Sequence, residues 1–388
     1  MALALEETSA PTERASGTYL WVYLIAAVLS GFGLAGKASL VGASHLKGLV
    51  VAAAIIGACF TPVLLWRLAL RLRRVVGPLV LFGVLLAALI GFPRVEALHA
   101  QGRGTDQPDC VIVAGTELAH GQWPYQRKEL WSHNSMSCGA GWVALQVPAL
   151  VAAGYAASLI VIWSAAIGAL VRILGWDRTS AAVSLMGLSP GLWLAACNGT
   201  DFLPFGLCIA VLCLAEGLPK RCAWIYSLLA GLVVQFRIPT IALPGLLSRD
   251  RNFAARVGSA ILAVLTQLGF LVWNAKGFLT DGPFSVVGKV SHAFSFSSGS
   301  PETILVAIGS LTLVCIAAFV VGRRSGGPGL TLGYLFLIFF VPAIFGLAQA
   351  AFKAHSLDRW EGGMWLVACI PLAAVQSVIG QARLPNPI

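Results

Sequence analysis

A polar segment at residues 94–139 holds many of the side chains in this chain that could do acid–base chemistry. It contains Asp106, Asp109, Glu117, Glu129 and three histidines, in a sequence that is 58% hydrophobic and only 11% charged. A positioned carboxylate can take the proton of an attacking hydroxyl group. So many ionisable groups in so apolar a chain indicate a functional site in this segment.

Three basic residues elsewhere could bind a phosphate. They are Arg237, Lys276 and Arg359. Arginine suits this task because its planar guanidinium can bind two oxygens at once. Arg237 stands inside an apolar stretch, where a charge is costly unless it faces protein or water; alternatively, it is an anchor that extends to the membrane surface. Arg359 could equally pair with an acidic neighbour.

The composition defines the medium in which these residues work. Soluble domains carry about 25% charged residues, more than twice the share found here. A bilayer core needs about 20 apolar residues for each spanning helix. The sequence therefore predicts an all-α polytopic membrane protein with about 10–12 transmembrane helices. Apolar runs occur at residues 18–36, 48–66, 76–92, 155–173, 181–197, 202–218, 257–274, 303–321, 329–349 and 363–380.

The stretch around Arg237 does not fit this pattern. Residues 222–247 are too many for one span and too few for two, and they include Pro239 and Pro244. A proline removes a helical hydrogen bond. We expect a broken hairpin of two half-helices here, and the alternative is one long kinked helix.

The loop charges set the orientation. Lysines and arginines recur at alternate connections, which predicts that these loops are cytoplasmic. The chain then divides into a cytoplasmic tail (1–17), a transmembrane hairpin (18–75), a transmembrane module (76–380) with an outer loop (93–140), and a second tail (381–388). The expected location is a multi-pass protein of a bacterial inner membrane, with its site toward the periplasm or exterior. Nucleic-acid binding would need a basic face with interleaved aromatic residues, and the sequence has no such patch.

The outer loop has a predicted internal order. We expect a surface helix at residues 111–120, with Asp106 and Asp109 just before its start, and a turn at 121–125. The free N–H groups at the start of a helix stabilise an acidic residue there. Asp109 is therefore either a functional carboxylate or a helix cap. Residues 143–153 form an apolar piece too short for a span. Cys110 and Cys138 could form a disulfide if the outside is oxidising.

The order of these features resembles that of a family. The residues that carry the resemblance are Asp106, Ala114–Gly121 (AGTELAHG), Pro124-Tyr125, Gly139-Ala140-Gly141-Trp142 with Pro148, Asn198 to Leu203 (NGTDFL), Gln235 to Pro239 (QFRIP), and Arg359-Trp360 with Pro371-Leu372. Together they are similar to the membrane glycosyltransferases of the GT-C superfamily, including mannosyl- and arabinofuranosyltransferases. Two features depart from that pattern: a helical hairpin precedes the module, and Val111 stands where a tyrosine often follows the aspartate.

The resemblance implies a glycosyltransferase that moves a sugar from a polyprenyl-phosphate donor to a glycolipid, polysaccharide or protein acceptor at the outer face of the bilayer. An outer-loop aspartate, Asp106 or Asp109, would be the general base, and the distance to the Pro124-Tyr125 turn favours Asp106. No cofactor or metal is expected.

Other residues are assigned to the substrates. Arg237, Lys276 and Arg359 would bind the donor phosphate. Tyr125, His133, His355 and Asp201 would contact substrate. Alternatively, Asp201 caps the helix that follows it, and the histidines are ordinary surface residues.

Two other classes compete with this interpretation. A transporter or flippase for a lipid-linked substrate would place its charges near the midplane, often in two related repeats of broken helices. Here one broken segment occurs without a matching partner in the other half. A structural scaffold would leave the two aspartates and the Arg-Pro segment without a purpose.

Overall fold

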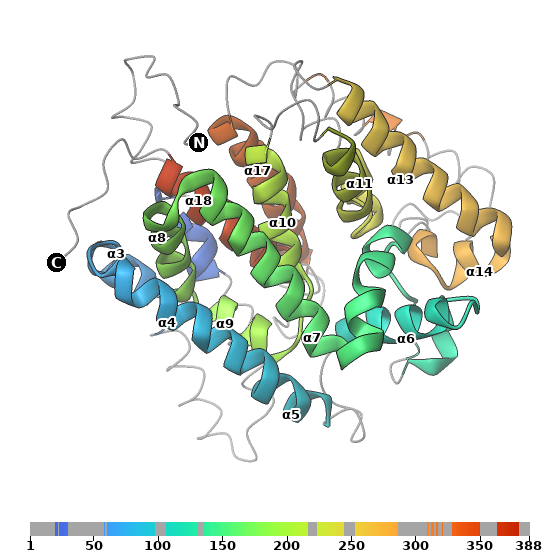
Figure 1. Cartoon of the computed structure of the whole chain (residues 1–388), viewed down its shortest axis with the longest axis horizontal. Helices are drawn as coiled ribbons and strands as arrows, with labels where there is room; N and C mark the ends of the chain where they lie inside the picture. The colour runs from blue at the N-terminus through green and yellow to red at the C-terminus, as the bar shows by residue number, and fades with distance from the viewer. Residues whose placement is uncertain are drawn as a thin grey trace. The chain divides into compact units, whose positions relative to one another are not determined.

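All regular secondary structure in the described part of the chain is helical. The computed structural model describes residues 20–21, 23–29, 58, 60–97, 106–130, 133, 135–215, 223–243, 253–285, 309, 312–313, 316, 320, 328–349 and 363–379. Within these residues there is no strand, and thirteen α-helices are bounded (Figure 1). They are α3 (Thr61–Arg71), α4 (Arg73–Leu86), α5 (Phe92–Glu96), α6 (Gln107–Ala119), α7 (Ala140–Leu174), α8 (Trp176–Gly187), α9 (Pro190–Cys197), α10 (Phe202–Leu214), α11 (Ala223–Val233), α13 (Phe253–Trp273), α14 (Ala275–Thr280), α17 (Pro328–Gln349) and α18 (Gly363–Ile379). Short π- or 3-10-helical turns are η1 (Ala87–Gly91), η3 (Arg127–Glu129), η6 (Ile238–Ala242) and η8 (Pro283–Ser285).

Two helical segments in the described residues are long and apolar enough to cross a membrane. One is the 24-residue segment Arg73–Glu96, made of α4, η1 and α5, and the other is the 35-residue α7. At 1.5 Å of rise per residue, both exceed a bilayer core of about 30 Å. They cover the predicted runs at 76–92 and 155–173.

The predicted run at 181–197 is not one continuous helix. It divides into α8 and α9, which are bent by 85° relative to each other. Pro190 opens α9, and Ser189 before it is extended (φ −81°, ψ 121°), because a proline ring disfavours helical geometry in the preceding residue. Taken together, α8 and α9 are a third candidate span in broken form, so a continuous span at this position was the wrong expectation.

The remaining runs form shorter helices or lie outside the described residues. The runs predicted at 202–218, 257–274, 329–349 and 363–380 form α10, α13, α17 and α18, which contribute apolar stretches of 10–17 residues. Those at 18–36, 48–66 and 303–321 lie largely outside the described residues. The arginine-rich connection expected after residue 66 is itself helical, because α3 continues to Arg71 and α4 begins at Arg73.

The chain forms two compact units, and helix α7 is divided between them. The first unit comprises residues 1–94, 163–211 and 327–388, and the second comprises residues 95–162 and 212–326. Each unit thus combines segments that are far apart in the sequence. The predicted outer loop belongs to the second unit from residue 95 onward.

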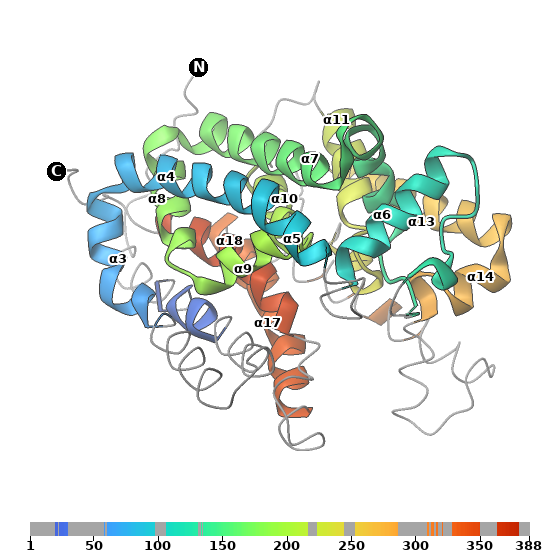
Figure 2. The same ribbon diagram turned by 90° about the horizontal axis from the view of Figure 1, so that it is seen from below.

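Helix α4 packs closely on α8 in the first unit, where α17 also packs on α18 (Figures 1 and 2). A Cβ atom on Gly77 would lie 2.1 Å from the Ser180 Oγ, and one on Gly187 would lie 2.2 Å from a Val80 methyl group. The hydroxyl of Tyr23, a fully buried residue, donates to the Leu185 carbonyl. Small side chains therefore let the two backbones approach, as membrane helix pairs commonly do.

The second unit holds α6, the first part of α7, and α11 packed on α13. Gly154 kinks α7 with φ +83°, a backbone conformation that favours glycine. The kink separates residues 143–153, predicted as a short apolar piece, from the run at 155–173. The Ser227 hydroxyl donates to the Ala255 carbonyl (3.1 Å) and joins α11 to α13.

Candidate functional site

Both candidate carboxylates lie at the start of α6. The helix begins at Gln107, four residues earlier than predicted, because Pro108 lies in the first turn, where its missing N–H would have no partner anyway. Asp106 is therefore the residue that precedes the helix, and it is partly exposed. Its side chain does not cap the helix amides.

Asp109 lies inside the first turn and is 8% exposed. The expectation that it lies before the helix, in the position of a cap, was wrong. Asp106 is thus the more accessible of the two groups, and Asp109 the more enclosed.

A disulfide connects α6 to the segment before α7. Cys110 and Cys138 are bonded, with Cα atoms 6.1 Å apart. This is the pair whose bonding the sequence left open. The segment has two further anchors: the Met136 amide donates to the Asp281 carbonyl (2.8 Å), and the Gly139 amide donates to the Phe236 carbonyl (3.2 Å). The loop is thus attached to α6, to the turn after α14 and to the break after α11.

The turn at residues 121–125 follows directly from the end of α6. Gly121 has φ +69°, and its amide donates to the Leu118 carbonyl while that of Gln122 donates to the Glu117 carbonyl. This pair of bonds is the Schellman arrangement that ends a helix at a glycine. It reverses the chain and directs Tyr125 into the protein.

Tyr125 is 2% exposed and lies in an aromatic cluster. Its ring centroid is 5.5 Å from that of Trp123, 6.0 Å from that of Phe270 and 6.1 Å from that of Phe278. Among the described residues its hydroxyl has no hydrogen-bond partner. Burial raises the pKa of this hydroxyl, and the nearby Arg237 charge lowers the pKa in part. Tyr125 is therefore a neutral hydrogen-bond donor at physiological pH.

Arg237 lies at a break in the chain. Helix α11 ends at Val233, the backbone at Arg237 is extended (φ −146°, ψ 158°), and η6 follows. The predicted interruption is therefore present, but in the described residues the piece after it is a five-residue 3-10 helix and not a half-helix. The Thr240 hydroxyl stabilises the break, because it accepts from the Arg237 amide (3.1 Å) and lies 2.7 Å from the Val234 carbonyl, to which it can donate.

The Arg237 side chain is enclosed, with the residue 6% exposed. Its guanidinium lies 4.1 Å above the centre of the Phe236 ring and donates to the Phe236 carbonyl (2.8 Å). A cation over an aromatic face is stabilised by the ring quadrupole. The charge is thus held close to the backbone of the break and near Tyr125.

Glutamine side chains form a buried network that the sequence analysis did not identify. The Gln235 carbonyl oxygen Oε1 accepts from the Gly141 amide (3.1 Å) and from the Gln267 Nε2 (2.7 Å). A Cβ on Gly139 would lie 1.7 Å from the Gln235 backbone oxygen. The available signal was the pair of glycines at 139 and 141, together with three glutamines in or beside apolar stretches: Gln146, Gln235 and Gln267.

The remaining predicted residues are distributed unevenly. Lys276 is exposed on α14, the helix that also carries Phe278 of the aromatic cluster. His133 is exposed, with φ +52°. Asp201 belongs to the first unit, where it is fully buried and its carbonyl accepts the Phe205 amide of α10 (3.1 Å). Arg359 and His355 lie outside the described residues.

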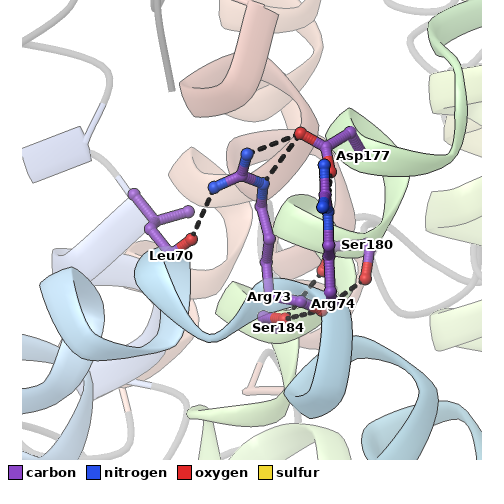
Figure 3. Close-up of polar contacts among 6 residues, drawn as sticks. All are labelled: Leu70, Arg73, Arg74, Asp177, Ser180 and Ser184. Carbon is purple, nitrogen blue, oxygen red and sulfur yellow. Dashed lines mark hydrogen bonds and ion pairs between the residues drawn. The ribbon is translucent and has the colours of Figure 1, made fainter. Parts of the chain in front are cut away.

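A second polar cluster lies in the first unit, and the sequence analysis did not predict it (Figure 3). The Arg73 guanidinium donates twice to one Asp177 carboxylate oxygen, at 2.5 and 3.1 Å, and once to the Leu70 carbonyl (3.0 Å). Arg74 donates to the other Asp177 oxygen (3.0 Å). Hydroxyl groups of α8 bind the Arg73 carbonyl, with Ser180 at 2.5 Å. This cluster joins α4 to α8.

The second unit contains carboxylates at the start of α6 and a buried arginine at the break after α11. Within the described ranges, no group of three or more His, Cys, Asp or Glu side chains gathers in a way that could hold a metal ion. The resemblance drawn from residue order has no support from other proteins: comparison of the chain with protein-family models, curated proteins and solved structures found no match.

Proposed function

We propose that this chain is a membrane glycosyltransferase of the GT-C type. The protein has 10–12 transmembrane helices. It transfers a sugar from a polyprenyl-phosphate donor to a hydroxyl acceptor at the outer face of the membrane, with Asp106 or Asp109 as the base. Glycolipids, polysaccharides and proteins are the acceptor classes. The two candidate spans in the described residues support a membrane setting.

The observation that carries the proposal is that one compact unit contains both the carboxylates and the arginine. Asp109 is the covalent neighbour of Cys110, which is bonded to Cys138. The next residue, Gly139, donates to the carbonyl of Phe236, the covalent neighbour of Arg237. The disulfide and this hydrogen bond connect the start of α6 to the break that carries Arg237. This connection supports the proposal that the carboxylates and the arginine serve one site.

The proposed reaction is a single displacement. The carboxylate takes the proton of the acceptor hydroxyl, whose oxygen bonds to the anomeric carbon of the sugar. The bond from that carbon to the donor phosphate breaks, and the electron pair leaves with the polyprenyl phosphate. Arg237, with Lys276 nearer the surface, stabilises the charge on that phosphate. One displacement inverts the anomeric configuration.

Transfer by the purified protein in lipid tests the proposal. Asp106→Asn and Asp109→Asn are compared with Glu129→Gln, which removes an exposed carboxylate from the same loop. Removal of a general base typically reduces the rate by 10²–10⁴-fold. We expect that loss in one of the two aspartate variants and an unchanged rate in Glu129→Gln. Full activity in both aspartate variants would remove the proposed base.

Arg237→Lys tests the phosphate assignment. Lysine keeps the charge but cannot bind two oxygens with one planar group. We expect a raised KM for the donor, with the KM for the acceptor unchanged.

Movement of a lipid-linked sugar across the membrane of sealed vesicles, without any sugar transfer, would instead favour the transporter or flippase.

A further inference from the structure

One face of helix α3 combines leucine with arginine. Leu64, Arg67, Leu68 and Arg71 are spaced at i, i+3, i+4 and i+7, so they form one stripe of the helix. All four are exposed, with Leu64 at 76% and Leu68 at 47%. The residues buried on the other side are Pro62, Ala69 and Leu70. Arginine stems lie along apolar surface while their charged heads reach water or lipid headgroups, so leucine and arginine on one exposed stripe suit a helix at a membrane surface.

The position of α3 supports this location. One residue, Leu72, separates α3 from α4, which begins the candidate span Arg73–Glu96. Figure 2 shows α3 running across the direction of α4. When α4 crosses the bilayer, α3 therefore lies along the boundary between the apolar core and water. Trp66 shares this helix, with the Arg67 guanidinium 5.1 Å from its ring centre. Tryptophan is enriched at the same boundary.

Three more arginines extend the charge. Arg74 is exposed at the start of α4, and Arg172 and Arg178 flank Asp177 in the sequence. Asp177 is already bound to Arg73 and Arg74 (Figure 3). Asp177 pairs with two arginines, and α3, which carries Arg67 and Arg71, packs on α8, which carries Arg178. Basic side chains therefore outnumber the acidic ones among the described residues of α3, the start of α4 and α8.

We propose that this surface, defined by Arg67, Arg71, Arg74, Arg172 and Arg178, binds the headgroups of acidic phospholipids. The leucines of α3 insert into the boundary while the arginine stems extend to the phosphate level. Each arginine held near an acidic membrane surface contributes about 1 kcal/mol, or roughly fivefold in affinity. The inference does not depend on the proposed enzymatic activity.

Thermal unfolding of the purified full-length protein in mixed micelles tests the inference. The unfolding midpoint is followed as phosphatidylglycerol is added, with phosphatidylcholine and inorganic phosphate as separate arms. The variants are Arg67→Gln/Arg71→Gln, the charge-preserving Arg67→Lys/Arg71→Lys, and Lys128→Gln, a matched control on an exposed lysine of the other unit. We expect phosphatidylglycerol alone to raise the midpoint of the wild type.

The glutamine double variant should need about 25-fold more phosphatidylglycerol for the same rise, because two arginines are lost. The lysine variant and Lys128→Gln should respond like the wild type. Native mass spectrometry of the wild type gives a second measurement: bound phosphatidylglycerol should decrease as salt screens the contact. An equal response to phosphatidylcholine, an equal response to inorganic phosphate, or an unchanged response of the glutamine variant would overturn the proposal.

Discussion

Arg73 and Arg237 are both buried, yet their surroundings differ. Arg73 donates to the Asp177 carboxylate and the Leu70 carbonyl. Arg237 lies over the Phe236 ring and donates to the Phe236 carbonyl. The first arrangement neutralises a charge and joins two helices, which is a structural role. The second holds a positive charge near the aromatic cluster, where that charge would attract an anionic ligand.

Asp177→Asn should destabilise the first unit. The amide removes the charge that compensates Arg73, whose side chain is 4% exposed. A hydrogen bond to a charged group contributes about 1.5–3 kcal/mol, and Asp177 is partly solvated, so a loss of about 1–2 kcal/mol is expected. The measurement is the midpoint of thermal unfolding in detergent. Arg74→Gln is the control, because this side chain is 63% exposed and its loss should shift the midpoint far less.

Tyr125→Phe separates stability from function. The Tyr125 hydroxyl is buried with no hydrogen-bond partner among the described residues, so its removal should leave stability unchanged or raise it by about 1 kcal/mol. If the hydroxyl donates to a substrate, the KM for that substrate should rise in the same variant. Unfolding midpoints and transfer kinetics measure the two effects. A large loss of stability would show that the hydroxyl has a structural partner.

The same residue has a defined pH signature. Because the pKa of Tyr125 is raised in the folded state, the unfolded chain loses this proton first as pH rises above about 10. The stability that Tyr125 contributes is therefore constant below that pH and decreases above it. Tyr125→Phe should weaken this alkaline decrease.

At the scale of elements, glycine contacts set how closely segments approach. Gly139→Ala should be severe, because its Cβ would lie 1.7 Å from the Gln235 backbone oxygen and would displace the break that carries Arg237. A Cβ atom on Gly168 in α7 would have no neighbour within 4 Å, so Gly168→Ala should be neutral or stabilising by up to about 1 kcal/mol. Transfer rates and unfolding midpoints of the two variants should differ in this order. Equal behaviour would mean that residues 139 and 235 do not approach this closely.

The disulfide between Cys110 and Cys138 is a second contact that holds segments together. Cys110 and Cys138 are 28 residues apart, and closing a loop of that length stabilises a fold by about 2–4 kcal/mol. Cys110→Ser/Cys138→Ser should lower the unfolding midpoint, and a reductant should lower that of the wild type by a similar amount. The reductant should leave the double variant unchanged. A reductant effect of equal size in both proteins would contradict this assignment.

Local rules predicted some elements from the sequence and missed others. The turn after α6 could be predicted because Gly121 stands where a helix end requires a positive φ. The predicted start of α6 is four residues late, because the apolar pattern begins at Val111 while Pro108 already lies in the first turn. The bend before Pro190 followed from one residue inside an apolar run, which hydropathy alone does not reveal.

Contacts between distant segments were harder to predict. The Gln235–Gln267 and Arg73–Asp177 pairs join residues 32 and 104 positions apart, and no local spacing marks them. The aromatic cluster around Tyr125 likewise joins the segment after α6 to α13 and α14. Residue types and local spacing therefore suggest candidate residues, but they do not show which of them are neighbours.

At the scale of the whole molecule, the charge distribution predicts a topology. Lysines and arginines favour the cytoplasmic side, so Arg71 and its neighbours should lie inside and Lys128 outside. Single cysteines at these positions, in a chain without its exposed native thiols, should differ in labelling by a membrane-impermeant maleimide. Lys128→Cys should react in intact cells, and Arg71→Cys only after permeabilisation. The reverse pattern would invert the topology and place the outer loop in the cytoplasm.

The bond between Cys110 and Cys138 also has a consequence for biogenesis. Thiols of this kind are kept reduced in the cytosol and become oxidised after export. The segment that contains both cysteines would therefore leave the insertion machinery with both thiols reduced, and the disulfide would form only on the far side of the membrane. The disulfide beside the two aspartates would then mark a segment that has been exported, and a chain retained in the cytosol would lack this bond.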